Sequence, residues 1–248
     1  MDNRQRLDLL LVDRQLAPSR ERAQSLILAG KVLVNAERVD KPGKSVKQDS
    51  ELLVQAHDHP YVSRGGVKLA GAIQEFQIEV FDRIGLDVGA STGGFTDCLL
   101  QHGARKVYAV DVGYGQLAWK LRQDPRVINL ERTNIRYLDP VNLVDPIQLV
   151  VVDASFISLR LILPKLHEIM PVQSKLLALV KPQFEALRKE IGKGGRVKEM
   201  AVHARVLSEI MQAAITLGFR MISSCESIIQ GKKSQNIEYF IHLEKSET

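Results

Sequence analysis

Four polar side chains stand in stretches that otherwise favour apolar residues, and their types could activate a hydroxyl group. They are Lys68, Asp153, Lys181 and Glu238. Asp153 and Lys181 directly follow two apolar runs, 147–152 and 176–180, that have the length of buried strands. Ligands of open α/β sheets bind outside the carboxyl ends of the strands, so we expect both side chains to face one cleft.

A positioned base is the chemistry that this set predicts. A hydroxyl group is a poor nucleophile at neutral pH, and it must lose its proton as it attacks an electrophile. We expect Lys181 to accept that proton in its neutral form, which the like charge of Lys68 and partial desolvation both favour. Asp153 and Glu238 would orient the two lysines. Taken one at a time, such residues are more often surface lysines or ordinary ion pairs.

A glycine-rich turn at 89–94 follows another apolar run and indicates a cofactor site. The stretch reads Leu86-Asp-Val-Gly-Ala-Ser-Thr-Gly-Gly-Phe95, and its glycines allow the backbone to approach a ligand closely. The next apolar run is followed by Asp111, 24 residues after Asp87, which suits hydrogen bonds from ribose hydroxyls. We therefore predict a nucleoside-containing cofactor.

The glycine spacing separates two classes of nucleoside cofactor. Ala90 to Thr92 intervene before the glycine pair, so the dinucleotide fingerprint is absent. An Asp two residues before the first glycine is instead typical of enzymes that use S-adenosylmethionine, where the carboxylate helps to position the cationic methionine moiety. We predict this cofactor, with contacts from Asp87, Gly89, Ala90, Ser91, Gly93, Gly94, Phe95, Asp111, Asn134 and Asp153.

The same turn has two other interpretations. Gly89-Ala-Ser91-Thr-Gly93 matches the G-x-S-x-G nucleophile elbow of α/β-hydrolases. A hydrolase also needs a late histidine after an acid, whereas His203 falls inside an expected helix and His242 lies near the end of the chain. A turn that binds nothing is the second alternative. For Asn134, a contact with adenine and a helix cap or turn are both open.

Alternating apolar runs and amphipathic stretches predict the elements that carry these groups. We expect strands at 84–88, 106–110, 127–130, 147–152 and 176–180, helices near 94–102, 115–121, 158–170 and 198–217, and an antiparallel pair at 220–227 and 236–243. This order is typical of a doubly wound, Rossmann-like α/β sheet. A further helix is expected to follow Gly66, with Lys68 at its start and Glu238 in the last strand.

The first 56 residues follow a different pattern and predict a separate, small α+β domain. Apolar residues recur at helical spacing over 6–16 and 19–29, and Ser19 marks a helix start. Strands are expected at 31–35 and 51–54. Residues 57–62 form the predicted linker, since the composition there is polar and the periodicity lapses, and residues 63–248 form the predicted catalytic domain.

These motifs together closely resemble the TlyA-like, or haemolysin A, family, whose catalytic domain is similar to the FtsJ-like ribose 2′-O-methyltransferases. The matching stretches are Arg6-Leu-Asp-Leu-Leu10, Ser19-Arg-Glu-Arg-Ala23, Lys31-Val-Leu-Val-Asn35, Tyr61-Val-Ser-Arg-Gly-Gly-Val-Lys68, Gly89-Ala-Ser-Thr-Gly-Gly-Phe95, Asp153-Ala-Ser-Phe-Ile-Ser-Leu159 and Val180-Lys-Pro-Gln-Phe184. The resemblance implies a class I methyltransferase sheet behind an RNA-binding domain of the ribosomal protein S4 type. It also assigns the family's catalytic Lys-Asp-Lys-Glu tetrad to the four residues above.

The substrate follows from the same resemblance. It implies methylation of a cytidine ribose in structured ribosomal RNA of one or both ribosomal subunits. The net charge of +5 and the pI near 9.2 favour such a polyanionic partner. We expect phosphate contacts from Arg4, Arg6, Arg20, Arg22, Lys31 and Arg64, with a solvated helix surface as the alternative. A second basic segment, 188–198, is either a loop that closes over substrate or simply a mobile one.

The remaining composition restricts the function classes. The two cysteines, Cys98 and Cys225, have no metal-ligand spacing, so we expect no metal site and a reducing, cytoplasmic location. No apolar run approaches the roughly 20 residues that span a bilayer, which argues against a pore-forming protein. A non-catalytic RNA-binding or ribosome-assembly factor is the alternative function. The presence of both lysines of the tetrad argues against it.

Overall fold

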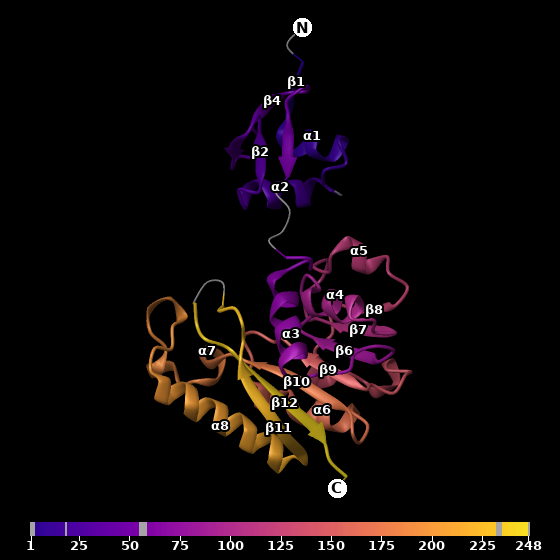
Figure 1. Ribbon diagram of the computed structural model, residues 1–248, viewed down its shortest axis with the longest axis vertical. Helices are drawn as coiled ribbons and strands as arrows, with labels where there is room; N and C mark the ends of the chain where they lie inside the picture. The colour runs from indigo at the N-terminus through magenta and orange to yellow at the C-terminus, as the bar shows by residue number, and fades with distance from the viewer. Residues whose placement is uncertain (1–2, 18, 55–58, 232–234, 248) are drawn as a thin grey trace. The chain divides into compact units, whose positions relative to one another are not determined.

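The chain forms two compact units, which are described separately. The computed structural model describes residues 3–17, 19–54, 59–231 and 235–247 (Figure 1). Packing divides the chain into Met1–Pro60 and Tyr61–Thr248. The predicted linker at 57–62 begins with residues 57 and 58, which lie outside the described residues.

The first unit combines two helices with short strands. The helices are α1 (Leu7–Asp13) and α2 (Arg20–Leu28), and the strands are β1 (Arg4–Arg6), β2 (Val32–Val34), β3 (Glu37–Val39), β4 (Ser45–Lys47) and β5 (Leu52–Val54). A three-stranded sheet has the order β3-β2-β5, and β1 pairs with β4. The expected helices and the strands β2 and β5 are confirmed. The expectation missed β1, β3 and β4, because each has three residues and buries at most one side chain, which leaves no alternation to detect.

Helix packing over this small sheet makes the core of the first unit. Leu7, Leu11 and Ile27 are fully buried between the helices and the strands. Ser19 begins α2 as expected, since its side chain accepts a hydrogen bond from the backbone N–H of Arg22. The helix start read from the sequence is therefore confirmed.

A seven-stranded sheet forms the centre of the second unit. Its order is β11-β12-β10-β9-β6-β7-β8, with strands β6 (Ile84–Val88), β7 (Lys106–Val110), β8 (Val127–Leu130), β9 (Leu149–Val152), β10 (Lys175–Val180), β11 (Phe219–Glu226) and β12 (Tyr239–Lys245). The strands β10, β9, β6, β7 and β8 are parallel, and β12 is antiparallel to both β10 and β11. The expected Rossmann-like α/β sheet is confirmed. Chain order reverses between β6 and β9, and ligands bind at such a switch point.

Helices cover both faces of this sheet (Figure 1). On one face lie α3 (Arg64–Glu75), α4 (Gly94–Gln101) and α5 (Trp119–Arg122); on the other lie α6 (Leu163–Ile169) and α8 (Met200–Thr216). Successive residues of β9 alternate between the two cores, with Val150 and Val152 facing α6 and α8. Short helical turns complete the unit: α7 (Pro182–Glu185), η1 (Ile135–Tyr137), η2 (Pro140–Asn142), η3 (Leu159–Leu161), η4 (Arg188–Glu190) and η5 (Lys193–Gly195).

Several boundaries differ from the expectation, and two of them concern the tetrad. Helix α3 begins at Arg64, capped by Ser63, so both glycines of the Arg-Gly-Gly run lie in its first turn and Lys68 lies further along the helix. Tyr61 explains why the second of these residues is glycine, because a Cβ on Gly66 would meet the tyrosine side chain at 2.3 Å. Strand β12 begins one residue after Glu238. Among the described residues, no helix has both the length and the apolar character to cross a membrane.

Candidate active site

A cleft of about 560 Å³ opens at the carboxyl ends of β6, β7 and β9, next to the switch point of the sheet. Its volume falls in the range of about 300 to 1,000 Å³ that is usual for small-molecule sites. Five of the predicted cofactor contacts line it. They are Gly89, Ser91, Asp111, Asn134 and Asp153.

The turn after β6 is fixed by a buried carboxylate. Oδ2 of Asp87 accepts hydrogen bonds from the backbone N–H of Thr96 at 2.8 Å and from its hydroxyl at 2.7 Å. This contact ties the end of β6 to the first turn of α4. Gly89 lies between the end of β6 and the start of α4 and has φ +85°. A Cβ on Gly89 would lie 2.7 Å from the carbonyl oxygen of Asp153. Only glycine fits this position without strain.

The second oxygen of Asp87 is left for another partner. Oδ1 is buried, and no donor among the described residues reaches it. Burial raises the pKa of Asp87 to about 7, and the nearby carboxylate of Asp153 adds to this effect. A buried, under-satisfied acid next to a cleft suits a cationic ligand group, because a positive charge favours the ionised carboxylate.

Asp111 and Asn134 line the same cleft from the ends of β7 and β8. The Asp111 carboxylate accepts backbone hydrogen bonds from Ser91 at 2.8 Å and from Gly113 at 2.6 Å. Each carboxylate oxygen keeps lone-pair capacity for a further donor such as a hydroxyl. Asn134 caps η1, since its Oδ1 accepts from the N–H of Arg136, and this leaves its amide N–H groups as donors. Asn134 therefore caps a helical turn and also lines the cleft, so its two expected roles do not exclude each other.

The other five predicted cofactor contacts are not among the lining residues. Asp87 is buried and directly precedes Val88 and Gly89, which line the cleft. Ala90 and Phe95 are buried in the core on the α3 and α4 face, where Phe95 stacks on Phe240. A Cβ on Gly94 would lie 2.1 Å from the hydroxyl of Ser63, so this glycine admits the start of α3. Gly93 has φ +91° and faces leucines of the neighbouring loop and α5. In this structure the turn's glycine pair serves helix packing more directly than ligand approach.

The predicted tetrad forms two ion pairs. Nζ of Lys68 lies 2.5 Å from Oε2 of Glu238, and the two side chains are 11% and 3% exposed. Nζ of Lys181 lies 2.5 Å from Oδ1 of Asp153, and Lys181 also donates to the Ser155 hydroxyl at 2.8 Å. Buried charges are stable only when paired in this way.

The sheet register brings these two pairs to one edge. Val180 of β10 pairs with Tyr239 of β12, so Lys181 follows one strand where Glu238 precedes the other. Gln183, two residues after Lys181, adds a contact to one pair, because its side-chain amide donates to the second oxygen of Glu238 at 3.4 Å. Asp153, which lines the cleft, joins this edge to the proposed cofactor site.

Sequence reasoning missed three residues that complete the site. Ser155 is a partner of Lys181, and Phe156, 90% exposed with φ +65°, lines the cleft and contacts the ring of Phe184 at a centroid distance of 5.0 Å. All three lie in the two stretches that follow β9 and β10. The family resemblance contained both stretches, but short polar and aromatic residues in loops carry no periodic signal from which a role could be read.

The predicted RNA contacts are divided between the units. In the first unit, Arg6 and Arg20 converge on the carboxylate of Asp8, which is fully buried. A hydrogen bond from Arg6 holds the pKa of Asp8 well below its usual range. Arg64 belongs to the second unit, where it donates to the carbonyl of Gln230 at 3.3 Å. Arg4 is exposed, and Arg22 and Lys31 are half-buried.

The two units match two known protein families. Residues 61–245 match the family described as FtsJ-like methyltransferase, and residues 5–52 match the S4 domain. A solved structure of a candidate S-adenosylmethionine-dependent methyltransferase from Listeria monocytogenes shares the fold, with a TM-score of 0.52 and 18% identity over 72% of this chain and 100% of that chain.

Several full-length proteins are also similar to the chain. The Bacillus subtilis protein YqxC, named as a candidate rRNA methyltransferase, is 49% identical over 97% of this chain and 85% of its own. The 16S/23S rRNA (cytidine-2′-O)-methyltransferase TlyA of Mycobacterium tuberculosis is 45% identical over 98% of this chain and 91% of its own. A solved candidate hemolysin from Streptococcus thermophilus is 45% identical, with a TM-score of 0.77 over 100% of this chain and 90% of that chain.

Proposed function

Because the chain belongs to the TlyA family, which joins an S4 domain to an FtsJ-like methyltransferase domain, we propose that it methylates the 2′ oxygen of a cytidine in ribosomal RNA. The methyltransferase class follows from family membership. The nucleotide and its ribose position are inferred from the printed activity of the Mycobacterium tuberculosis relative. The cleft and the paired lysines support this reaction.

S-adenosylmethionine suits the residues of the cleft. Asp87 holds a buried carboxylate oxygen without a donor among the described residues, which suits the ammonium of the methionine moiety. Asp111 is the candidate acceptor for the ribose hydroxyls, and Asn134 is the candidate contact for adenine. When bound, the cofactor supplies an electrophilic methyl group on a positively charged sulfur.

Lys181 is the residue that we assign to proton removal. The ion pair with Asp153 at 2.5 Å describes the ammonium form of Lys181. In the reactive form Lys181 has released one proton to solvent, its amine takes the proton from the 2′ hydroxyl as the oxygen attacks, and Asp153 stabilises the ammonium that forms again. The Ser155 hydroxyl holds the same nitrogen from another side. Glu238 balances the charge of Lys68, so the repulsion that we expected between the two lysines is offset and does not by itself favour the neutral amine of Lys181. The contact between Lys181 and Asp153 at the cleft is the observation that carries the proposal.

The first unit is assigned to RNA binding. Its match to the S4 domain supports this role, and Arg6 and Arg20 present guanidinium groups from a fixed position on Asp8. Both arginine side chains are about half exposed, so they can still contact phosphates. We propose that Arg4, Arg22 and Lys31 act with them, and that Arg64 contacts RNA from the second unit.

Transfer of a labelled methyl group tests the function. Ribosomal subunits from a strain that lacks this protein would be incubated with the full chain and labelled S-adenosylmethionine, and the product mapped by nuclease digestion. We expect label at a ribose 2′ oxygen of a cytidine. Label on a base would refute the proposed reaction. Demonstrated cofactor binding without label on either subunit would refute ribosomal RNA as the substrate.

A further inference from the structure

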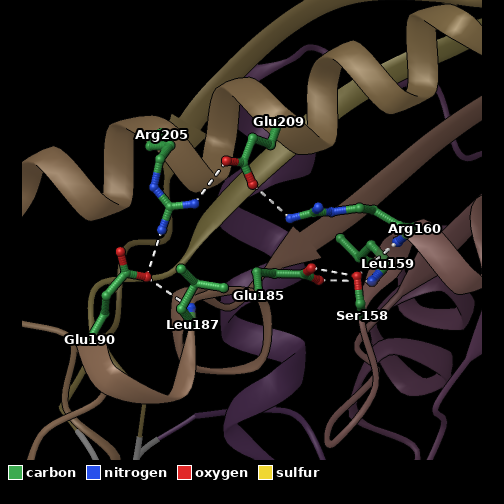
Figure 2. Close-up of polar contacts among 8 residues, drawn as sticks. All are labelled: Ser158, Leu159, Arg160, Glu185, Leu187, Glu190, Arg205 and Glu209. Carbon is green, nitrogen blue, oxygen red and sulfur yellow. Dashed lines mark hydrogen bonds and ion pairs between the residues drawn. The ribbon is translucent and has the colours of Figure 1, made fainter.

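A carboxylate outside the tetrad joins the two stretches that carry Asp153 and Lys181. Glu185 accepts a hydrogen bond from the Ser158 hydroxyl at 2.5 Å and another from the backbone N–H of Leu159 at 2.7 Å (Figure 2). Glu185 is partly buried and ends α7, the turn that begins directly after Lys181. Burial raises the pKa of its carboxyl. We call these two contacts the Glu185 brace.

The brace is the last of three successive links between the stretches 153–159 and 181–185. The first is the ion pair of Lys181 with Asp153. The second is the ring contact of Phe184 with Phe156. The third is the Glu185 brace. The stretches therefore run side by side, and the residues between Asp153 and Ser158 are held at both ends.

A strained residue lies between those two ends. Phe156 has φ +65°, a left-handed conformation that is unfavourable for a bulky side chain, and the residue is 90% exposed. Such a conformation persists only where the surrounding structure fixes it. With the brace removed, the contacts of Lys181 with Asp153 and Ser155 and the ring contact of Phe156 with Phe184 remain, but the end of the loop at Ser158 is released. Relaxation from that end would shift the partner of Lys181.

An outer set of ion pairs surrounds the brace without touching the cleft. Arg160 donates to Glu209 of α8 at 2.8 Å, and Arg205 bridges Glu209 at 2.7 Å and Glu190 at 2.6 Å (Figure 2). Glu209 is about one-third exposed, and its partners are exposed to a similar degree. Partly exposed ion pairs of this kind contribute little to the stability of the fold. They offer matched controls in the same region of the molecule.

We propose that Glu185 is a positioning residue for methyl transfer, which holds the Asp153 loop against Lys181 through Ser158 and Leu159. This inference rests on the proposed function. It concerns a residue that makes no contact with the tetrad itself, and it assigns the acidic end of the Lys-Pro-Gln-Phe-Glu185 stretch a role in keeping the proton acceptor aligned.

Three variants of the full chain test the proposal with ribosomal subunits as substrate. Glu185→Ala removes both acceptors, whereas Glu185→Gln can still accept from Leu159 and donate to Ser158. Glu209→Ala is the control from the outer pairs. Because small misplacements of reacting groups cost up to roughly 100-fold in rate, we expect Glu185→Ala to lower kcat about 10- to 100-fold. Because the loop also lines the cleft, we expect the affinity for S-adenosylmethionine to fall by less than kcat does. We expect wild-type kcat in Glu209→Ala and rescue in Glu185→Gln.

Hydrogen exchange of the segment 154–161 gives a readout that does not need activity. The brace predicts faster exchange in Glu185→Ala and wild-type exchange in Glu185→Gln. Unchanged kcat or unchanged exchange in Glu185→Ala would overturn the inference. So would a loss of cofactor affinity or of thermal stability that parallels the loss of kcat, since either would make Glu185 a general structural residue. An inactive wild-type chain would instead refute the proposed function, while exchange would still decide the brace.

Discussion

Lys181 and Glu238 occupy the next positions of the antiparallel register in which Val180 pairs with Tyr239. The strand pair thus brings together two residues 57 positions apart in sequence. Each faces its own partner of opposite charge, Asp153 and Lys68. Pro182 follows Lys181 and lacks a backbone N–H, so the ladder ends at this point and the chain turns into α7. The site is built at the place where the pairing stops.

Removal of the Lys181 amine is expected to abolish methyl transfer. A positioned general base contributes roughly 10² to 10⁴ in rate, so kcat of Lys181→Ala should fall by about that factor. The affinity for S-adenosylmethionine should be retained, because Lys181 is assigned to proton removal, whereas the proposed cofactor contacts are Asp87, Asp111 and Asn134. Single-turnover transfer and calorimetric titration would measure the two quantities. Lys165→Ala, on α6, where the lysine pairs with Glu168, is the control. Substantial activity in Lys181→Ala would exclude its role as the base.

Loss of one charge from the buried pair of Lys68 and Glu238 is expected to cost more stability than loss of both. An unpaired buried charge costs about 3 to 5 kcal/mol, whereas apolar replacement of a whole pair is often neutral. Glu238→Ala should therefore lower the free energy of unfolding by several times the amount seen in the double variant Lys68→Met with Glu238→Leu. Urea unfolding followed by circular dichroism would compare them. Equal losses in the two proteins would mean that the pair is effectively solvated.

Long periodic elements of the fold could be predicted from the sequence, and short ones could not. Strands β6, β7 and β8 have the expected bounds. For β6 and β7 the reason is burial, because buried parallel strands read as continuous apolar runs, whereas β8 is a half-buried edge strand. The first-unit strands β1, β3 and β4 hold three residues each and are specified by their partners across the sheet. Helix α3 begins earlier than expected because Gly65 and Gly66 are tolerated where Tyr61 packs against the helix.

Residue types at strand ends predicted which side chains lie together better than the glycine pattern did. Asp153 and Lys181 lie at the ends of their strands and contact each other, as expected for groups at one edge of a parallel sheet. Gly94 and Phe95 were expected at the cofactor, but their surroundings are α3 and the core. A glycine allows any neighbouring group to come close, because it has no Cβ. The sequence alone could not show whether that group is a ligand or a neighbouring helix.

Stability of the first unit is expected to depend on the ionisation of Asp8 in acid. Its folded pKa is lowered, first by the hydrogen bond from Arg6, so the stabilisation is fully present above the ordinary pKa of about 4 and is lost as pH falls through the folded value. Asp8→Asn should lose about 1 to 2 kcal/mol at pH 7 and show a shallower decline below about pH 4. Thermal unfolding from pH 2 to pH 7 would measure both slopes. Parallel curves for the two proteins would contradict the assignment.

Binding of S-adenosylmethionine is expected to release protons from Asp87 near neutral pH. Burial raises the pKa of this carboxyl to about 7, so a large fraction is protonated at pH 6.5. A cationic ligand group favours the carboxylate, and the proton must leave as the ligand binds. Calorimetric titration at pH 6.5 in two buffers of different ionisation enthalpy should therefore give a release of up to about one proton, falling to none above about pH 9. Asp87→Asn, whose side chain can still accept from Thr96, should bind without proton release. A buffer-independent enthalpy for the wild-type protein at pH 6.5 would place the cation away from Asp87.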